Sequence, residues 1–277
     1  MRPARVFLWT ALAMVAFAGN SLLCRAALKD TAIDAATFST IRMASGAIAL
    51  WIIVRVRDGA RPPEGSWLSA FWLVAYAIAF SFAYLTLTAA TGALLLFGAV
   101  QATMIGAGLL KGERFTALQL GGVALALGGL AGLLLPGVSA PPPLGAALML
   151  FAGLSWGFYS LRGRGAGDAT RVTAGNFARA VPFAVLASIL ALARVSADTQ
   201  GMLLAVASGA ITSGVGYAIW YTALPNLKAT VAATVQLSVP PIAALGAVLF
   251  LGESITLRLV ACSVAILGGI AVVVTRR

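Results

Sequence analysis

Ten stretches of about 20 mostly apolar residues follow one another along this chain, each bounded by charged residues, prolines or glycine clusters. A helix needs roughly 20 residues to cross the hydrocarbon core of a bilayer, and the backbone crosses that core only as helices or closed barrels. The spacing therefore predicts an all-α membrane protein with ten transmembrane helices. The expected segments are residues 5–26, 35–54, 66–86, 91–110, 116–135, 144–161, 174–193, 202–222, 229–250 and 256–274.

Composition supports this class, because 61% of the residues are hydrophobic and only 10% are charged. A soluble domain usually has about 25% charged residues, so this chain has too few to cover a water-facing surface. The connections between the segments, such as residues 136–143, are too short to form a soluble domain. We therefore expect no catalytic or binding domain outside the membrane.

The net charge of +11 arises from 19 Lys and Arg against 8 Asp and Glu. When the basic residues are assigned to alternate connections, thirteen fall on the side of the two termini and four on the opposite side, while Arg42 and Arg179 lie inside segments. Basic residues are enriched on the cytoplasmic side of membrane proteins. The charge therefore predicts that both termini are cytoplasmic, and it indicates membrane topology rather than a nucleic-acid partner.

The second half of the chain repeats motifs of the first half, which predicts a five-helix unit at residues 1–136 and another at residues 143–277. Because five is odd, the second unit enters the membrane from the opposite side, so the repeats are inverted. Inverted repeats are typical of secondary transporters, whose binding site lies between the two units; the alternative is a duplicated scaffold without transport activity. The matching motifs are Phe17-Ala18-Gly19 with Phe151-Ala152-Gly153, Gly112-Glu113-x-x-Thr116 with Gly252-Glu253-x-x-Thr256, Leu127-Gly128-Gly129 with Leu267-Gly268-Gly269, and Arg42 with Arg179.

The two Gly-Glu-x-x-Thr junctions, the Leu-Gly-Gly near the end of each half, Pro240 in the ninth segment and the five-plus-five layout resemble the drug/metabolite transporter superfamily in its EamA-type branch of ten-helix carriers. The resemblance covers nearly the whole chain. Length and aromatic content also look like the aromatic amino acid exporters of that branch in bacteria. The resemblance implies an inner-membrane carrier that works by alternating access, with helices 3 and 4 rocking against helices 8 and 9 around a cavity faced by helices 1 and 6.

Aromatic side chains recur every four residues in the third and eighth segments, and such spacing places them on one face of a helix. We expect these faces to line the substrate cavity, and packing between helices is the alternative. The candidate residues are Tyr76, Phe80 and Tyr84 in the third segment, Tyr217, Trp220 and Tyr221 in the eighth, and Trp156 and Tyr159 in the sixth.

Polar side chains inside the segments need partners in lipid. They are candidates for binding the amine and carboxylate of a zwitterionic substrate, and hydrogen bonding between helices is the alternative. The amides are Asn20, Gln101 and Gln236, and the hydroxyls are Ser21, Thr103 and Ser155.

Arg42 and Arg179 lie about seven residues inside their segments. A charge at that depth needs compensation. Either these side chains attract a substrate carboxylate, or they extend to the near interface, which an Arg side chain can reach. Pro240 and Pro241 interrupt the hydrogen-bond ladder of the ninth segment, which indicates either a gate or a static bend.

The conventional proton-carrying groups are missing from the middle of the segments, because the chain has no His and all eight carboxylates fall in connections or at helix ends. We therefore expect transport without obligatory proton coupling. Glu113 and Glu253 are expected to anchor helix ends, for instance against Arg114 or Arg258, and coupling at the ends is the alternative. Close helix contact, as scaffold or in a homodimer, is expected from the small residues Gly121, Gly128, Gly132, Gly268 and Gly269.

We expect a carrier that moves small amphipathic metabolites across the bilayer, with aromatic or large apolar amino acids as exported substrates. A broad drug or organic-cation exporter is the main alternative, although such sites often use an intramembrane carboxylate. An enzyme is disfavoured because no nucleophile and base pair is recognisable, and no cofactor or metal is expected, since Cys24 and Cys262 form no ligand motif. A pore is the remaining alternative.

Overall fold

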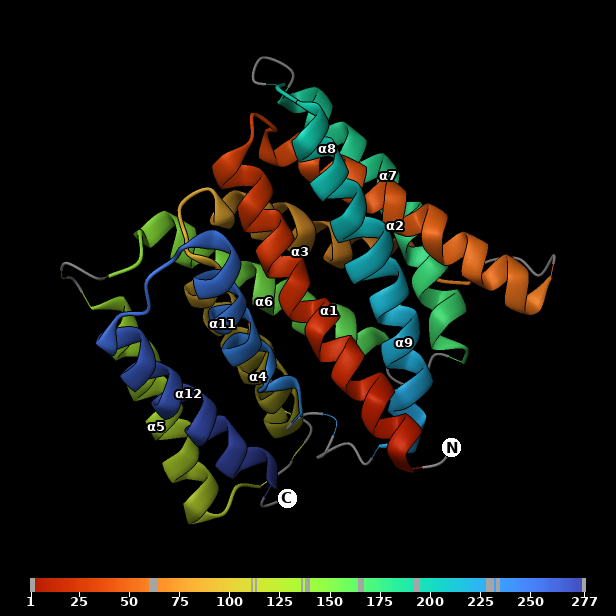
Figure 1. Cartoon of the computed structure of the whole chain (residues 1–277). Helices are drawn as coiled ribbons and strands as arrows, with labels where there is room; N and C mark the ends of the chain where they lie inside the picture. The colour runs from red at the N-terminus through yellow and green to blue at the C-terminus, as the bar shows by residue number, and fades with distance from the viewer. Residues whose placement is uncertain are drawn as a thin grey trace.

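The computed structural model describes residues 3–59, 64–110, 112, 114–135, 137, 140–163, 167–191, 195–227, 232 and 235–275. Within these ranges the regular structure is entirely helical (Figure 1). The first half contains α1 (Pro3–Asp30), α2 (Ala35–Asp58), α3 (Trp67–Tyr84), α4 (Ala89–Leu110) and α5 (Ala117–Leu134). The second half contains α6 (Pro143–Gly163), α7 (Ala169–Leu190), α8 (Thr199–Val206), the π-helix η2 (Ala207–Val215), α9 (Gly216–Ala223), the short 3₁₀-helix η3 (Leu224–Asn226), α11 (Val239–Leu251) and α12 (Leu257–Thr275).

The helix lengths confirm a multi-pass membrane protein. Among the described residues, nine helical runs are long and apolar enough to cross a bilayer, and one of them is the continuous run Thr199–Asn226 formed by α8, η2, α9 and η3. A tenth apolar helix, α11, has only 13 residues. Part of the expected ninth segment, at residues 229–231 and 233–234, lies outside the described residues.

The prolines of the ninth segment begin a helix instead of bending one. The chain turns at Leu237 and Ser238, and Pro240 and Pro241 then occupy the first turn of α11. Proline is favoured there because the first turn of a helix does not need its missing N–H. The expected interruption of the ninth segment at these prolines is therefore confirmed for the described residues, but the break lies just before them and not within a helix.

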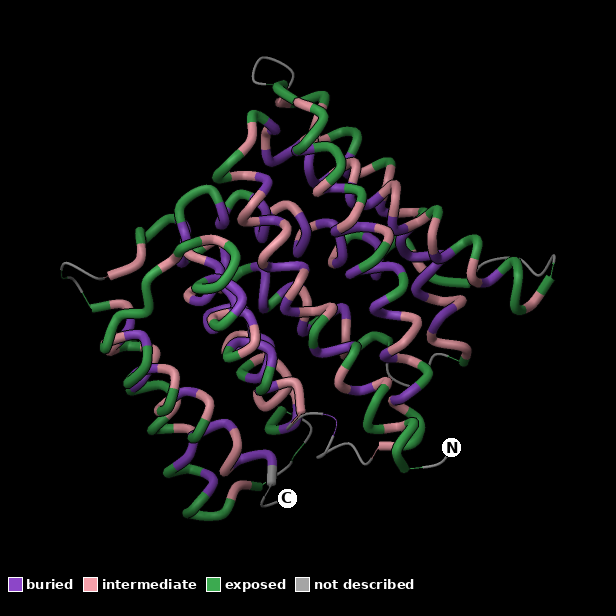
Figure 2. The backbone as a smooth tube through the Cα atoms, in the orientation of Figure 1, coloured by how far each residue is buried: buried purple, intermediate pink, exposed green. Residues whose placement is uncertain are grey.

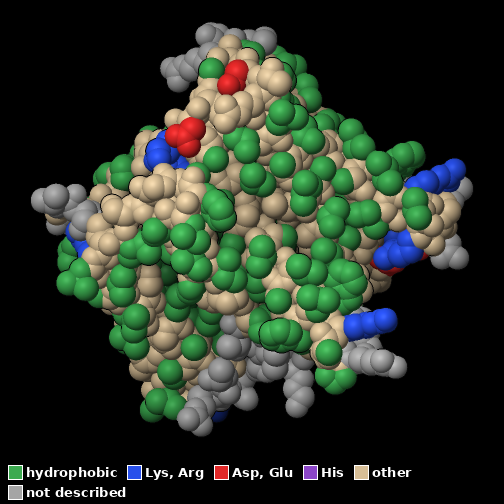
Figure 3. Space-filling view, in the orientation of Figure 1, with side chains coloured by type: hydrophobic (Ala, Val, Ile, Leu, Met, Phe, Trp, Pro, Cys, Tyr) green, Lys and Arg blue, Asp and Glu red, His purple; other side chains and the backbone are tan. Residues whose placement is uncertain are grey.

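The outer surface suits a lipid environment. Figure 3 shows apolar side chains over most of the visible face, with the visible Lys, Arg, Asp and Glu toward its rim. Large apolar side chains such as Leu110, Leu190, Phe250 and Leu257 are strongly exposed. In water such a surface would cause the protein to associate or aggregate, whereas in a bilayer it contacts lipid acyl chains.

The two halves have equivalent helix neighbours. α3 and α4 of the first half contact α6, the first helix of the second half. In the same way, α9 and α11 of the second half contact α1, the first helix of the first half. Between the halves, α2 packs on α7, α4 on α11, and α5 on α12. The α5–α12 pair lies at one side of the molecule in Figure 1, while the buried residues in Figure 2 gather mainly in the other helices. The core therefore lies mainly where the two halves meet outside the α5–α12 pair.

Glycines hold α5 against α12, but only some of them are the glycines expected to make close contacts. A Cβ on Gly122 would lie 2.7 Å from the Gly269 carbonyl oxygen, and one on Gly129 would lie 2.8 Å from the Ala265 Cβ. Gly269 and Gly132 do face the partner helix as predicted. Gly121, Gly128 and Gly268 make no close contact within the described chain, since nothing lies within 4 Å of a Cβ on any of them.

Asp34 fixes the connection between α1 and α2. Its carboxylate accepts hydrogen bonds from the N–H groups of Ala36 and Thr37, which caps α2, and from the N–H of Ser196 in the segment before α8. Partial burial tends to raise the pKa of Asp34, but these hydrogen bonds outweigh it and hold the pKa below its usual value. The carboxylate is therefore charged at neutral pH, as a cap at a helix N-terminus should be.

Candidate functional site

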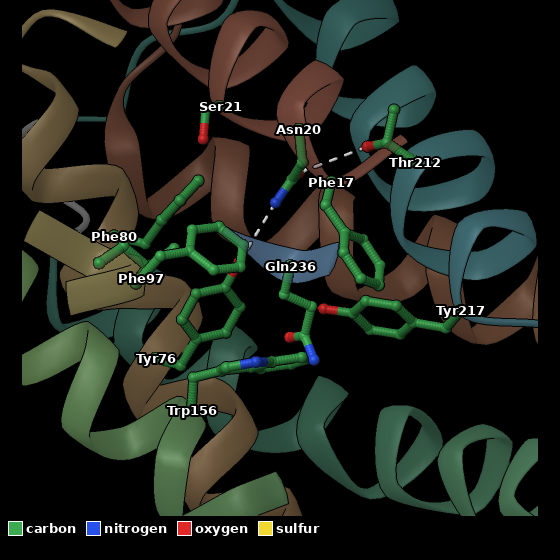
Figure 4. Close-up of a pocket in the computed structure, with 11 residues that line it drawn as sticks. Phe17, Asn20, Ser21, Tyr76, Phe80, Phe97, Trp156, Thr212, Tyr217 and Gln236 are labelled. Carbon is green, nitrogen blue, oxygen red and sulfur yellow. Dashed lines mark hydrogen bonds between the residues drawn. The ribbon is translucent and has the colours of Figure 1, made fainter. Parts of the chain in front are cut away.

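A small cavity lies where the two halves meet, between α1, α3, α4, α6, η2 and α9 (Figure 4). Its volume of about 20 Å³ holds roughly one water molecule. Aromatic rings form most of its wall, Asn20 and Thr212 form a polar corner, and the Gln236 amide lies beside Trp156 and Tyr217. The lining residues are Phe17, Asn20, Ser21, Tyr76, Phe80, Leu96, Phe97, Trp156, Thr212, Tyr217 and Gln236.

The aromatic wall is a continuous chain of ring contacts across four helices. The Trp156 ring on α6 lies 5.0 Å from the Tyr76 ring on α3 and 5.2 Å from the Tyr217 ring on α9. The Tyr217 ring also meets Phe17 of α1 edge-on, with 5.6 Å between centroids. Ring pairs at these distances are attractive, so the wall joins the two halves of the chain at the cavity.

Asn20 forms the polar corner. Its side-chain oxygen accepts hydrogen bonds from the hydroxyls of Ser208 at 2.6 Å and Thr212 at 3.4 Å, both on η2. Its side-chain nitrogen donates to the Tyr76 hydroxyl at 3.2 Å. A π-helical segment often marks a functional site, and here it carries two of the three hydroxyls that hold the amide.

Arg42 of α2 lies directly behind this corner and is fully buried. Its Nη2 donates to the Tyr76 hydroxyl at 3.0 Å, and its Nε donates to the Ser213 hydroxyl at 3.4 Å. The guanidinium carbon lies 5.2 Å from the centroid of the Tyr76 ring and 5.0 Å from that of Phe80. The interpretation that Arg42 extends to the membrane interface is therefore wrong.

Arg179, the counterpart of Arg42 in the sequence repeat, occupies a different environment. It is half-buried on α7, and its Nη1 donates to the carbonyls of Gly175 at 3.0 Å and Glu64 at 3.3 Å. Glu64 belongs to the connection before α3, so this side chain extends to the near end of its helix, as the interface interpretation predicted. Arg179 is not part of the cavity wall.

The cavity contains only part of the predicted site. Asn20, Tyr76, Phe80, Trp156, Tyr217 and Gln236 line it, whereas Tyr84, Gln101, Ser155, Tyr159, Trp220 and Tyr221 lie outside the lining. Eight residues of helix separate Tyr84 from Tyr76, which is about 12 Å along the axis. One aromatic face is therefore too long for one small cavity, and its far end packs elsewhere.

Packing partners account for several of the excluded residues. The Tyr84 ring lies against Gly92, where a Cβ would overlap it, and its hydroxyl donates to the Ala89 carbonyl at 3.4 Å. The Tyr159 hydroxyl accepts from the Asn176 amide at 3.4 Å. Pro240 and Pro241 border an apolar groove against α12 rather than the cavity.

Several residues at the site were not predicted from the sequence: Phe17, Leu96, Phe97, Ser208, Thr212 and Ser213. The three hydroxyls of η2 had a recognisable signal, since they cluster within six residues of an otherwise apolar segment. Leu96 and Phe97 had none, because nothing distinguishes them from the other apolar residues of α4.

One end of the bundle is held by Glu253. Its carboxylate pairs with the Arg25 guanidinium at 3.0 Å and accepts from the N–H of Ala89 at the start of α4 at 2.8 Å. Arg25 also donates to the Tyr84 carbonyl at 2.8 Å. Glu253 thus anchors helix ends as predicted, but its partner is Arg25 and not Arg258, which donates to the Gly132 carbonyl. Glu113 lies outside the described residues.

The fold and the site define a class: a multi-pass α-helical membrane protein with a buried aromatic and polar cavity where its two halves meet. The model of the EamA-like transporter family matches residues 143–275. An uncharacterized protein of Pseudomonas aeruginosa is 55% identical over 278 aligned residues, which cover 100% of this chain and 97% of that protein. The chain belongs to the EamA-like transporter family, whose members are membrane transporters of small substrates.

A solved crystal structure has the same fold. It is 19% identical in sequence, its TM-score is 0.70, and the match covers 98% of this chain and 97% of that one. At this level of identity the likeness extends to the arrangement of helices alone.

Proposed function

We propose that this transporter is an alternating-access carrier in the bacterial inner membrane that exports amino acids with aromatic or large apolar side chains. The observation that carries the proposal is the cavity wall of Tyr76, Trp156 and Tyr217 beside the polar corner at Asn20. Stacked rings suit a flat apolar side chain, and the corner suits the polar end of the same molecule. The buried Arg42 cation behind the wall disfavours an organic cation, because like charges repel strongly in a low-dielectric interior.

The size of the cavity supports a carrier that changes conformation. A space of about 20 Å³ cannot hold an amino acid, so binding requires the helices around it to separate. A pore needs a continuous water-filled path, whereas a carrier passes through a state closed at both ends. The equivalent neighbours of α1 with α9 and α11, and of α6 with α3 and α4, support inverted repeats that move against each other.

Topology is the first prediction. A cysteine introduced at Gly59 should react with a membrane-impermeant maleimide only from the cytoplasmic side, and one at Pro142 only from the periplasmic side. The reason is the excess of Lys and Arg on the side of the termini. Labelling is compared in right-side-out and inverted vesicles, and reaction of both positions from one side would contradict the alternating topology.

Breaking the Arg25–Glu253 pair should loosen one end of the carrier. Glu253→Gln keeps an oxygen for the Ala89 N–H but removes the charge opposite Arg25, and the pair is nearly buried, with side-chain exposures of 13% and 7%. The native Cys24, fully buried 3.9 Å from the Ser81 hydroxyl of α3, then reports on separation of α1 from α3. We expect its alkylation in a Cys262→Ser background to become severalfold faster.

Proton coupling is measured in the same variant. Exchange by both the wild type and Glu253→Gln should persist when the proton gradient is dissipated, because no Asp, Glu or His lies in the middle of an expected segment. Loss of proton-driven uptake in Glu253→Gln, with Cys24 reactivity unchanged, would show that this carboxylate couples transport instead of holding the helix ends.

The substrate class is tested by uptake of a labelled panel into proteoliposomes. We expect phenylalanine, tyrosine, tryptophan and leucine to be taken up, with alanine, glycine and quaternary ammonium compounds much slower. Preferential uptake of the quaternary ammonium compounds would favour the organic-cation exporter and overturn the amino acid proposal.

A further inference from the structure

Arg42 is a buried cation that has no counterion among the described residues. The salt bridges of the described residues involve Arg25, Arg57 and Arg171, and Arg42 contacts only hydroxyls and rings. Its Nη1 is buried and has no hydrogen-bond partner in the described part of the chain. Burying an unpaired charge is strongly unfavourable, so this arrangement calls for an anion that the protein itself does not provide.

The Tyr76 hydroxyl connects this charge to the cavity. Its oxygen accepts one hydrogen bond from Arg42 Nη2 at 3.0 Å and another from Asn20 Nδ2 at 3.2 Å. A tyrosine oxygen has two lone pairs and one proton, so both lone pairs are engaged and the proton is left to donate elsewhere. Tyr76 lines the cavity, and a group in the cavity is therefore within reach of an O–H donor that a cation polarises.

The surroundings hold this donor in place. The orientation of Asn20 is set by the hydroxyls of Ser208 and Thr212, which donate to its oxygen. The guanidinium lies over the rings of Tyr76 and Phe80, which stabilise a cation through their π-faces. These contacts hold Asn20 and Arg42 in place, but none of them supplies a negative charge opposite the guanidinium.

We propose that Tyr76 and Arg42 form a carboxylate-binding subsite in the cavity. The Tyr76 hydroxyl donates a hydrogen bond to the substrate carboxylate. Arg42 is a positioning residue that orients this hydroxyl and supplies the positive charge opposite the carboxylate. The proposal rests on the proposed transport of amino acids and deepens it, because it requires the transported molecule to carry a carboxylate, whether or not it carries an amine.

Matched ligands test the subsite in purified protein. L-phenylalanine, 3-phenylpropionate, which lacks the amine, and 2-phenylethylamine, which lacks the carboxylate, compete with labelled L-phenylalanine for binding. In the wild type we expect both carboxylates to compete and the amine to bind at least about tenfold more weakly, since charge-assisted hydrogen bonds are the strong ones. Equal competition by 3-phenylpropionate and 2-phenylethylamine would overturn the subsite without any variant.

Variants then separate a binding role from a structural one. Arg42→Gln should weaken 3-phenylpropionate by about tenfold to a hundredfold, and it should not weaken 2-phenylethylamine, whose ammonium group no longer meets a like charge. Tyr76→Phe, which keeps the ring, should weaken the acid severalfold. Arg179→Gln is the matched control and should keep the preference for acid over amine. Ligand-free Arg42→Gln should unfold at a temperature no lower than the wild type, because an unpaired buried charge has been removed.

Two further outcomes are informative. If Arg42→Gln lowers thermal stability strongly and weakens acid and amine equally, Arg42 is structural and the subsite is wrong.

Hexanoate and hexylamine test the subsite separately from the proposed aromatic substrates. Thermal stabilisation of the wild type by hexanoate but not by hexylamine, together with no binding of L-phenylalanine, would retain the subsite and contradict the aromatic substrates.

Discussion

Gly209→Leu should abolish transport and destabilise the folded protein by about 3 kcal/mol, the upper range for overpacking a core. Gly209 belongs to η2, and any Cβ at this position overlaps the Arg42 carbonyl oxygen and the Ser45 hydroxyl of α2. A leucine therefore pushes η2 away from α2, and with it Ser208 from Asn20 and Ser213 from Arg42. Thermal unfolding and proteoliposome exchange measure the two effects.

Gly128→Leu is the matched control, because Gly128 also lies inside a membrane helix but has nothing within 4 Å of an added Cβ. Its stability and exchange rate should stay close to those of the wild type. If Gly209→Leu unfolded at the wild-type temperature and still transported, η2 would not be packed against α2 as described.

Tyr217→Ala should weaken the binding of aromatic amino acids by about tenfold and leave alanine transport nearly unchanged. Tyr217 lines the cavity, between the rings of Trp156 and Phe17. A ring contact contributes about 0.5–1.5 kcal/mol beyond the area it buries, and 1.4 kcal/mol is a factor of ten in affinity. Exchange rates at varied concentrations of phenylalanine and alanine give the comparison.

Tyr221, one helical turn further along the same element, provides the control. It packs against the core but does not line the cavity, so Tyr221→Ala should affect all substrates alike and lower thermal stability. Tyr84→Ala should do the same, since its ring packs on Gly92. Selective loss of aromatic substrates in Tyr221→Ala but not in Tyr217→Ala would place the binding surface one helical turn further along the same face of α9.

The transmembrane helices could be predicted from the sequence because a bilayer imposes one length on every crossing. The interruption of the ninth segment could also be predicted, from Pro240 and Pro241, but the sequence did not show that these prolines begin a helix instead of bending one. Close helix contact was expected from the small residues of α5 and α12, but the sequence did not show which glycines make it. Gly128 and Gly129 are adjacent glycines that the sequence does not distinguish, and only the three-dimensional arrangement shows that Gly129 faces Ala265.

The cavity was less predictable than the fold, because spacing places residues on a face without showing how far along the helix a cavity extends. Tyr76 and Tyr84 share a spacing, yet only Tyr76 lines the cavity. Arg42 and Arg179 match in the repeat and lie at similar depths in their segments. One turns into the bundle toward Tyr76 and the other reaches the Glu64 carbonyl, a difference set by neighbouring helices.

The most direct test of an alternating-access carrier for these substrates is the initial rate of labelled L-phenylalanine entry into proteoliposomes, with and without unlabelled L-phenylalanine inside. A carrier that reorients around one site gives rates that saturate with external substrate and are severalfold faster into preloaded vesicles. A rate that rises linearly with concentration and is the same in loaded and empty vesicles would contradict the account and indicate a pore.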